Sequence, residues 1–432
     1  MKRTIKIYTV TLLLLVAVSS CKKEYGSLNA PTVEDYQKDA SKDQLNGLVT
    51  GVLSGMRNNE GTYLDAVGVM GREIYRFSNA DPRFVTELLG QDNITLNNTG
   101  FYLVNPWTSR YRVVKNCNVL ITSATNSTKI PDNQKKGYLG FAKTIKAYEL
   151  LLNLNLTYTN GIRVDVADPN NLGPILTYDE SIAAISDLLN EAKTDLTGAA
   201  IVFALNSGFT DLSDGPGLIK LNRAIAARVD VYRKLWTVAL TDLAASFLDI
   251  NGDFTKGAYE IFSTGSGDVL NPAYFDQNAA GEVRLAHPSY VTDISAGDSR
   301  IGKATLRTAT ASNSGLSSNR DVWVYRSSTA PIPIIRNEEL VLLYAEANFQ
   351  LDQLPAGKTA LDKVRATYGQ TPTGALSKES FLTEMLRQRR FSLYYEGHRW
   401  IDMRRYNLLE SLPKDRAGDD VWVNMPIPST EQ

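Results

Sequence analysis

The sequence predicts a mostly helical protein, built from helix pairs of the tetratricopeptide kind with an irregular region of loops and short strands. Apolar residues recur at spacings of three and four along several segments, which is typical of amphipathic helices. These segments have similar lengths and stripe spacings, which suits stacked helix pairs. Residues 251–330 are instead rich in Gly, Ser, Thr, Asn and Asp, and this composition indicates loops with a few strands.

The helices are expected where apolar stripes meet start and stop signals. In 141–158 the stripe runs from Ile145 to Leu156, and Asn160-Gly161 then ends the helix. Thr177 and Glu180 form a capping box that opens the next helix. The remaining helices are expected over 221–236, 336–350, 377–396 and 398–409. The segment 336–350 is apolar nearly all round, so we expect it to pack on several sides.

The N-terminus has the parts of a secretory signal peptide, which we assign to residues 1–20. Positive side chains precede an apolar stretch over 10–18, and small residues then precede Cys21. The stretch is shorter than the roughly 20 residues that a membrane-spanning helix needs. Residues 18–21, Val-Ser-Ser-Cys, resemble the lipobox of bacterial lipoproteins. Acyl chains on Cys21 would then anchor the mature protein.

The expected location is the outer membrane, lipid-anchored and facing the cell exterior. Lys22-Lys23-Glu24 resembles the surface-export signal of Bacteroidetes lipoproteins. We expect residues 21–45 to form a tether and residues 46–432 to form a single domain.

The charge balance argues against a nucleic-acid partner. Removing residues 1–20 leaves 412 residues with 43 basic and 47 acidic side chains, a net charge of about −4. Nucleic-acid binding usually needs a basic face. Cys117 is the other cysteine, which excludes a disulfide framework and indicates a buried thiol.

The sequence predicts no catalytic residues, no metal site and no cofactor. The two histidines, His287 and His398, occur without a zinc motif. Glu396 and His398 are adjacent enough to suggest acid-base chemistry, but Glu396 and Asp402 are expected to pair with nearby arginines and tie helices together. With 47 acidic residues, a glycosidase-like carboxylate pair stays open as an alternative.

The C-terminal part resembles the SusD/RagB family over two segments. They read Pro331-Ile332-Pro333-Ile334-Ile335-Arg336 with Glu339-Leu340-Val341-Leu342-Leu343-Tyr344-Ala345-Glu346-Ala347, and Arg389-Arg390 with Tyr395-Glu396-Gly397-His398-Arg399-Trp400-Ile401-Asp402-Met403-Arg404-Arg405-Tyr406. Upstream, Trp107, Tyr111, Asn116 and Asn118 resemble the family's early helix. Gln388 and Ser392 stand where the family usually has glutamates, which questions the pairing of helices there.

The resemblance implies a tetratricopeptide-like helical protein that works with a SusC-like TonB-dependent outer-membrane barrel. Such a lipoprotein sits over the barrel as a lid and hands over its ligand, commonly a glycan and in some cases a peptide. Two other functions stay open: a protein-binding assembly scaffold, and a carbohydrate-active enzyme.

Ligand binding is expected on the irregular segments 57–110 and 251–330, because loops on a rigid scaffold commonly carry binding sites. Aromatic rings offer flat faces for sugars at little entropic cost. The candidate rings are those of Tyr63, Tyr274, Phe275, Tyr290, Trp323 and Tyr325, and the candidate hydrogen-bonding groups are Asn58, Asn59, Asp276, Gln277 and Asn278. Trp323 and Tyr325 are two residues apart and are expected to share one strand face.

Lipidation is tested by replacing Cys21 with alanine. The wild-type protein should sediment with the membrane fraction, and the C21A variant should lose this membrane anchoring because it lacks the acylated sulfur. Retention of the C21A variant in washed membranes to the same extent as the wild type would contradict an acyl anchor at this residue.

Overall fold

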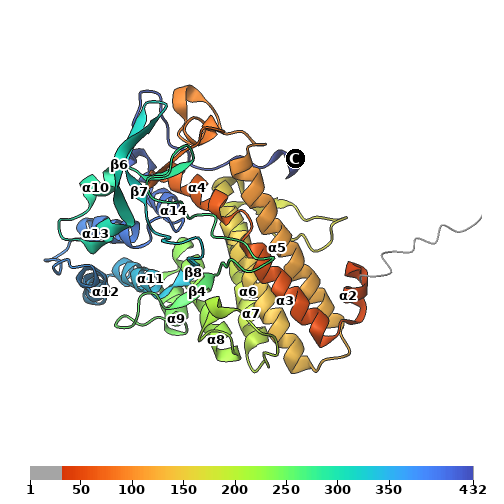
Figure 1. The fold of residues 1–432 in the computed structure, drawn as a ribbon. Helices are drawn as coiled ribbons and strands as arrows, with labels where there is room; N and C mark the ends of the chain where they lie inside the picture. Colours follow the sequence, from red (N-terminus) through yellow and green to blue (C-terminus); the bar gives the residue numbers. More distant parts are fainter. Residues whose placement is uncertain (1–31, 432) are drawn as a thin grey trace, which may run out of the picture.

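Helices form most of the computed structural model, which describes residues 32–431, and this confirms the mostly helical prediction. The signal peptide expected over 1–20 and the lipidation site Cys21 lie outside the described residues. Long N-terminal helices lie side by side at one side of the molecule, and the main sheet and the C-terminal helices lie at the other (Figure 1). None of the described helices is both long enough and apolar enough to cross a membrane.

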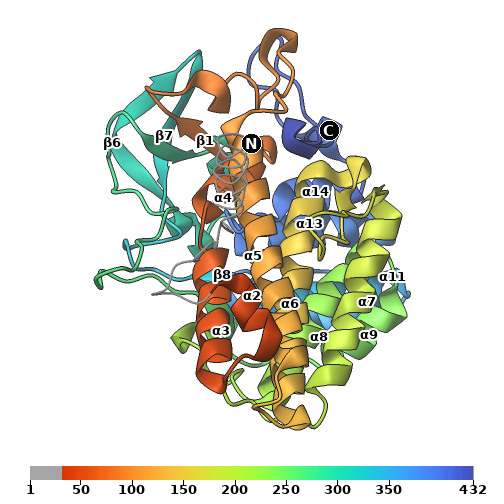
Figure 2. The same cartoon turned by 90° about the vertical axis from the view of Figure 1, so that its right-hand side faces the viewer.

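The N-terminal layer is a set of antiparallel helices in which α6 packs against both α5 and α7 (Figure 2). Its helices are α2 (Val33–Asp39), α3 (Lys42–Met56), α5 (Phe101–Asn126), α6 (Asp132–Thr157) and α7 (Tyr178–Leu196). Gly140 lets α6 and α7 approach closely, because a Cβ there would lie 2.4 Å from Cγ of Leu196. The expected capping box of Thr177 and Glu180 is present at the start of α7.

The segment expected to be a tether, 21–45, is helical from Val33 onward, so that expectation is corrected. Capping boxes at Thr32 and Ser41 start α2 and α3, and α3 buries the apolar stripe of Leu45, Val49, Val52 and Met56. The end of α5 holds α2 in place: Asn126 Nδ2 donates to the Gln37 carbonyl at 2.8 Å, and Ser127 Oγ donates to the Ala40 carbonyl at 2.7 Å.

The segment expected to be irregular, 57–110, contains a complete helix, α4 (Glu60–Met70), and the first turns of α5. Nearly every residue of α4 is buried, so the helix lacks the polar face that makes a helix recognisable in a sequence. Its first turn lies against the loop at Pro272, since a Cβ on Gly61 would meet the Pro272 carbonyl oxygen at 2.8 Å.

The helix expected over 221–236 is divided into α8 (Gly215–Tyr232) and α9 (Trp236–Ala244). Lys234 has a φ of 60°, the left-handed conformation in which helices commonly end. The Leu235 amide then donates to the Asp230 carbonyl at 2.9 Å, which closes the end of α8. Because glycine usually occupies such a position, the lysine concealed this break in the sequence.

Residues 251–330 form loops with short strands, as expected, and supply most of a four-stranded antiparallel sheet. Its order is β1 (Ile74–Phe77), β5 (Val283–Ala286), β7 (Leu316–Val322) and β6 (Ala304–Asn313). The smaller elements are β2 (Ile162–Arg163) with β3 (Ile175–Leu176), β4 (Gly257–Glu260) with β8 (Ile332–Arg336), and α10 (Ser289–Asp293). Strand β7 ends at Val322, so Trp323 and Tyr325 do not share a strand face as expected.

The C-terminal helices are α11 (Asn337–Gln350), α12 (Leu354–Thr367), α13 (Lys378–Ser392) and α14 (Arg399–Arg405). Nearly all of α11 is buried, which confirms that it packs on several sides. The helices expected over 377–396 and 398–409 are confirmed but end earlier, at Ser392 and Arg405.

Buried ion pairs join these helices to α8 and β8. Arg228 of α8 donates to both carboxylate oxygens of Glu339 at 2.6 and 2.7 Å. Arg336 of β8 donates to both oxygens of Glu396 at 3.0 and 2.8 Å. Removing these charges from water costs free energy, and the two parallel hydrogen bonds in each pair offset that cost.

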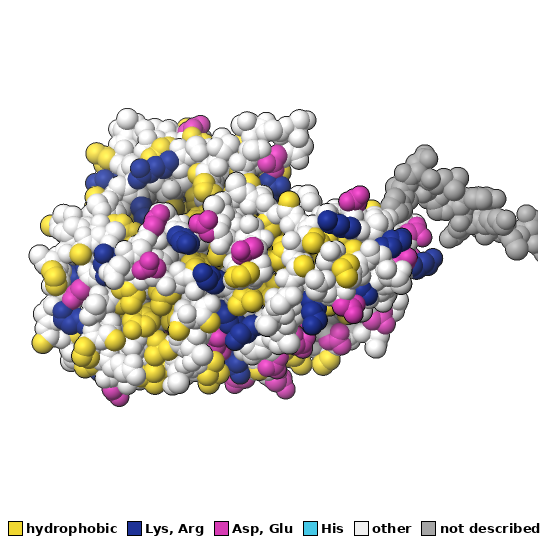
Figure 3. Space-filling view, turned by 90° about the horizontal axis from the view of Figure 1, so that it is seen from below, with side chains coloured by type: hydrophobic (Ala, Val, Ile, Leu, Met, Phe, Trp, Pro, Cys, Tyr) yellow, Lys and Arg dark blue, Asp and Glu magenta, His cyan; other side chains and the backbone are white. Residues whose placement is uncertain are grey.

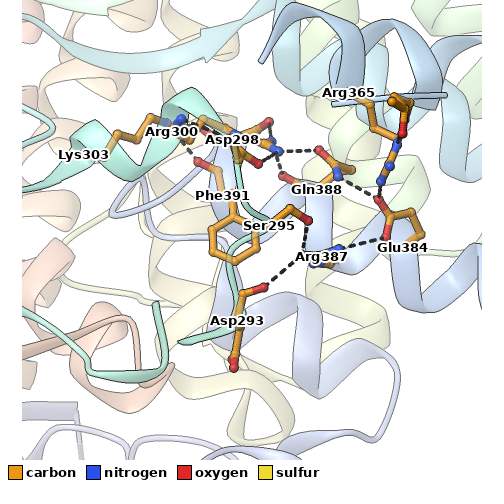
Figure 4. A network of polar contacts seen from close by, with 12 residues as sticks. Asp293, Ser295, Asp298, Arg300, Lys303, Arg365, Glu384, Arg387, Gln388 and Phe391 are labelled. Atoms are coloured by element: carbon orange, nitrogen blue, oxygen red, sulfur yellow. Dashed lines mark hydrogen bonds and ion pairs between the residues drawn. The ribbon is translucent and has the colours of Figure 1, made fainter. Parts of the chain in front are cut away.

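A second network fastens the irregular region to α13, as Figure 4 shows. Arg300 donates to Asp298 at 2.9 and 2.6 Å, to Gln388 Oε1 at 2.7 Å and to Ser392 Oγ at 2.8 Å. Gln388 Nε2 also donates to Glu384 at 2.8 Å. Gln388 and Ser392 therefore anchor α13 to the irregular region, and the helix is held at the two positions where the sequence put its pairing in question.

Replacing Arg300 with methionine should destabilise the protein by about 3–5 kcal/mol, because Asp298 would remain buried without its ion-pair partner. Urea unfolding measures this change. The control is Arg326→Met, since Arg326 is exposed and should change the free energy of unfolding by less than about 0.5 kcal/mol. Equal stability of the two variants would contradict a structural role for the Arg300 network.

Candidate ligand-binding surface

Three of the predicted ring residues lie in the core, so the exposure expected for Tyr63 and Tyr290 is wrong and Tyr325 is not available for stacking on a ligand. Tyr63, Tyr290 and Tyr325 are 2%, 1% and 5% exposed. The Tyr290 hydroxyl donates to the Arg300 carbonyl at 2.8 Å, and the Tyr325 hydroxyl donates to the Tyr395 carbonyl at 3.2 Å. Polar neighbours in the sequence suggested exposure, but tertiary contacts supply the partners that let these tyrosines be buried.

Tyr274 and Trp323 remain half-exposed, and the fold brings their rings together from distant segments. Their ring centroids are 6.1 Å apart with an interplanar angle of 48°. We call this pair and the polar residues 276–278 beside it the Tyr274–Trp323 surface. Two tilted rings with free edges can contact both the apolar face and the rim of a bound ring.

Backbone hydrogen bonds fix both rings of the Tyr274–Trp323 surface. The Asn271 amide donates to the Ser328 carbonyl at 2.7 Å, and Asn271 Nδ2 donates to the Ala330 carbonyl at 2.6 Å. The Trp323 amide donates to the Lys303 carbonyl at 2.7 Å. These contacts pin the loop that carries Tyr274 to the segment that follows β7, so the ring pair is held before a ligand arrives.

Exposed amide and acid side chains lie beside the rings. The Asn278 backbone amide donates to Asp321 at 2.7 Å, and Asn278 Oδ1 accepts from the Thr308 amide at 2.7 Å. The Tyr274 hydroxyl donates to Asp276, and this hydrogen bond raises the pKa of Tyr274. Gln277, Asn278 and Asp276 are all exposed, so they present amide and carboxylate groups that can bond hydroxyls.

Phe275 has a different role from its neighbour Tyr274. Its half-buried ring lies 5.0 Å from the Arg76 guanidinium and 4.3 Å from that of Arg284. Arg284 in turn donates to both oxygens of Asp65 at 2.5 and 2.8 Å. Phe275 therefore caps a buried charge network and anchors the loop.

The amides near the start of α4 lie close to this region, because Gly61 contacts Pro272. Asn59 Nδ2 donates to Ser109 Oγ at 2.8 Å, and Asn58 is exposed. The structure shows no hydrogen bond between either amide and the residues 276–278.

The Glu396–Arg399 motif is structural in this fold. Glu396 accepts from Arg336, and Asp402 accepts from Arg389 at 2.7 Å, which confirms the expected pairing with arginines. His398 is 8% exposed, and burial lowers its pKa to about 4. A neutral, buried imidazole has no access to a dissolved substrate.

Other predicted features have simple outcomes. Cys117 is buried in α5, which confirms the expected buried thiol, and burial raises its pKa. Within residues 32–431, no cluster of three or more His, Cys, Asp or Glu side chains has a metal-binding arrangement. Acidic and basic side chains are interspersed on the face shown in Figure 3.

A cavity of about 410 Å³ lies between the ends of α6, α8 and α14 and the starts of α7 and α9. It was not predicted from the sequence. Three tyrosines line it, namely Tyr158, Tyr178 and Tyr232. Tyr232 lies in the helix expected over 221–236, and Tyr158 lies at the end of the helix expected over 141–158. Their positions in the sequence therefore indicated core packing.

Comparisons with known proteins find the same fold. The SusD family model matches residues 293–425. A SusD superfamily protein from Parabacteroides distasonis shares 16% identity and a TM-score of 0.68, over 90% of this chain and 96% of that one. Surface glycan-binding protein A from Bacteroides thetaiotaomicron shares 13% identity and a TM-score of 0.71, over 92% and 97%. Its complex with laminarihexaose matches at 12% identity and a TM-score of 0.69, over 91% and 97%. No curated protein matches the sequence.

The pH dependence of stability tests the buried state of His398. Its folded pKa of about 4 lies below the ordinary 6.5, so the unfolded chain binds the extra proton between these values. The contribution to stability is therefore fully present above pH 6.5 and is lost as the pH falls toward 4. Across this window the wild type should lose up to roughly 3 kcal/mol more than His398→Asn. Urea unfolding at several pH values measures the difference, and parallel pH profiles would contradict a buried neutral imidazole.

Proposed function

We propose that this chain binds a glycan at the Tyr274–Trp323 surface, as a protein whose residues 293–425 match the SusD family model and whose fold is that of SusD superfamily proteins. The observation that carries the proposal is the half-exposed ring pair, with centroids 6.1 Å apart, beside exposed amide and carboxylate groups. The apolar face of a sugar packs on an aromatic ring, and the amides and acid bond its hydroxyls.

The binding is expected to be non-catalytic. The loop 271–278 is held by backbone hydrogen bonds to residues 328 and 330, so little conformational entropy is lost when a ligand is bound. Such a surface can retain a glycan and release it unchanged, which is the chemistry that a delivery protein needs.

We further propose that the protein is held at the outer membrane, facing the cell exterior, through acylated Cys21. It would pass its ligand to a SusC-like TonB-dependent barrel. The support for this step is the lipobox-like sequence before Cys21 and the match of the SusD family model to residues 293–425. A pull-down of the natural protein from solubilised outer membranes should recover a barrel protein of this kind, and recovery of the lipoprotein alone would contradict the partnership.

The ligand proposal is tested by titrating glycans, starting with β-glucan oligosaccharides and extending to other glycans and to peptides. Tyr274→Ala and Trp323→Ala should each weaken binding about tenfold or more, because truncating a central aromatic contact commonly costs more than 1.4 kcal/mol. Isothermal titration calorimetry measures the affinities.

The matched control is Tyr36→Ala, which removes a half-exposed tyrosine from α2 on another element. It should leave the affinity unchanged. A glycan that binds equally well to the wild type, Tyr274→Ala and Trp323→Ala would contradict the assignment of the surface, and binding of peptides in place of glycans would contradict the ligand class.

A further inference from the structure

The cavity of about 410 Å³ noted above is distinct from the Tyr274–Trp323 surface. Its walls come from the ends of helices α6, α8 and α14 and the starts of α7 and α9, and none of its lining residues belongs to the irregular segment 251–330. Its volume falls within the range of about 300–1,000 Å³ that is typical of small-molecule sites.

The tyrosines of this cavity carry hydroxyls without internal partners. Tyr232 is 5% exposed, yet among residues 32–431 no group hydrogen-bonds its hydroxyl, and the same holds for Tyr158 and Tyr178. These hydroxyls line the cavity, so each is available to donate a hydrogen bond to a bound molecule or to accept one from it. The rings themselves are held firmly: the Tyr158 and Tyr178 centroids are 4.7 Å apart in an edge-to-face arrangement.

The charges at the cavity mouth favour an anion. Lys234 is exposed and makes no ion pair within the described chain, and Arg233 lies 3.8 Å from Asp230 without a hydrogen bond. The third cation, Arg405, is already neutralised by Glu346 and Asp402 at 2.8 Å each. Lys234, which has no ion-pair partner among the described residues, and Arg233, which is paired only at 3.8 Å with Asp230, therefore outnumber the single exposed carboxylate of Asp179.

Two lining residues have positive φ angles, 60° for Lys234 and 46° for Tyr158. Glycine is the usual residue at a position such as that of Lys234, because a side chain costs roughly 1 kcal/mol there. The fold thus keeps a lysine at the cavity mouth where glycine would adopt the same backbone at lower cost.

We propose that this cavity binds an anionic sugar, a pyranose ring that carries a carboxylate or a sulfate ester. The tyrosine rings and free hydroxyls contact the sugar ring and its hydroxyls, and Lys234 with Arg233 pairs with the anionic group. The site stands independently of the Tyr274–Trp323 surface, so the two can be tested separately.

The probes are D-glucuronate, D-glucose 6-sulfate and neutral D-glucose, titrated into the full-length chain in detergent and followed by ligand-observed NMR. At least one anionic probe should bind more tightly than glucose. Lys234→Gly should weaken that binding about fivefold by removing an exposed charge, and Tyr232→Phe should weaken it about fivefold by removing one hydrogen bond. Which anionic probe is preferred distinguishes a carboxylate from a sulfate.

Both variants are chosen to keep the fold. Lys234→Gly relieves the left-handed backbone, and Tyr232→Phe retains the packed ring, so their thermal midpoints should equal or exceed that of the wild type. Lys220→Ala removes a matched exposed charge from the other end of α8 and should leave the affinity unchanged. The proposal is overturned if neither anionic probe binds more tightly than glucose, if Lys234→Gly and Tyr232→Phe retain full affinity, or if Trp323→Ala abolishes the binding.

Discussion

The packing of α8, α11 and α14 depends on ion pairs that are buried between these helices. Glu339 and Glu346 of α11 lie opposite Arg228 of α8 and Arg405 of α14. A buried charge without its partner costs several kcal/mol, so these pairs admit only one registration of the helices. They join α8, α11 and α14, helices that are far apart in the chain.

This paired core supports the Tyr274–Trp323 surface. Tyr395 follows α13 and donates its hydroxyl to Asp65 at 2.6 Å, and Asp65 also accepts from Arg284 beneath Phe275. Arg300 fastens the irregular region to α13 through Gln388. The irregular region is therefore attached to α4 through Asp65 and to α13 through Gln388. These attachments explain how an irregular segment holds two aromatic rings in fixed positions.

Helices with one exposed face and one buried face were predictable from the sequence, whereas helices buried on all sides were not. The stripe from Ile145 to Leu156 and the capping box at Thr177 identified α6 and α7, because an amphipathic pattern records which side meets water. The helix α4 has no exposed face, so its sequence lacks the periodic alternation of apolar and polar residues that marks an amphipathic helix. The break at Lys234 was hidden because the sequence shows no glycine there.

The candidate site was predictable only in part for a related reason. Polar neighbours surround Tyr63, Tyr274 and Tyr290 alike in the sequence, yet only Tyr274 reaches the surface. Burial of a tyrosine depends on whether a distant carbonyl can accept its hydroxyl, and that partner is not visible locally. The tyrosine cavity forms where the ends of several helices meet, so the sequence of any one segment could not predict it.

The most direct measurement follows the indole N–H signals of the five tryptophans by NMR while a bound glycan is titrated. Assignment of the Trp323 signal comes from its disappearance in Trp323→Phe. Saturable movement of the Trp323 signal, with the other indoles unmoved, is the expected result. An unmoved Trp323 signal under saturating glycan, with another indole shifting in its place, would contradict the account.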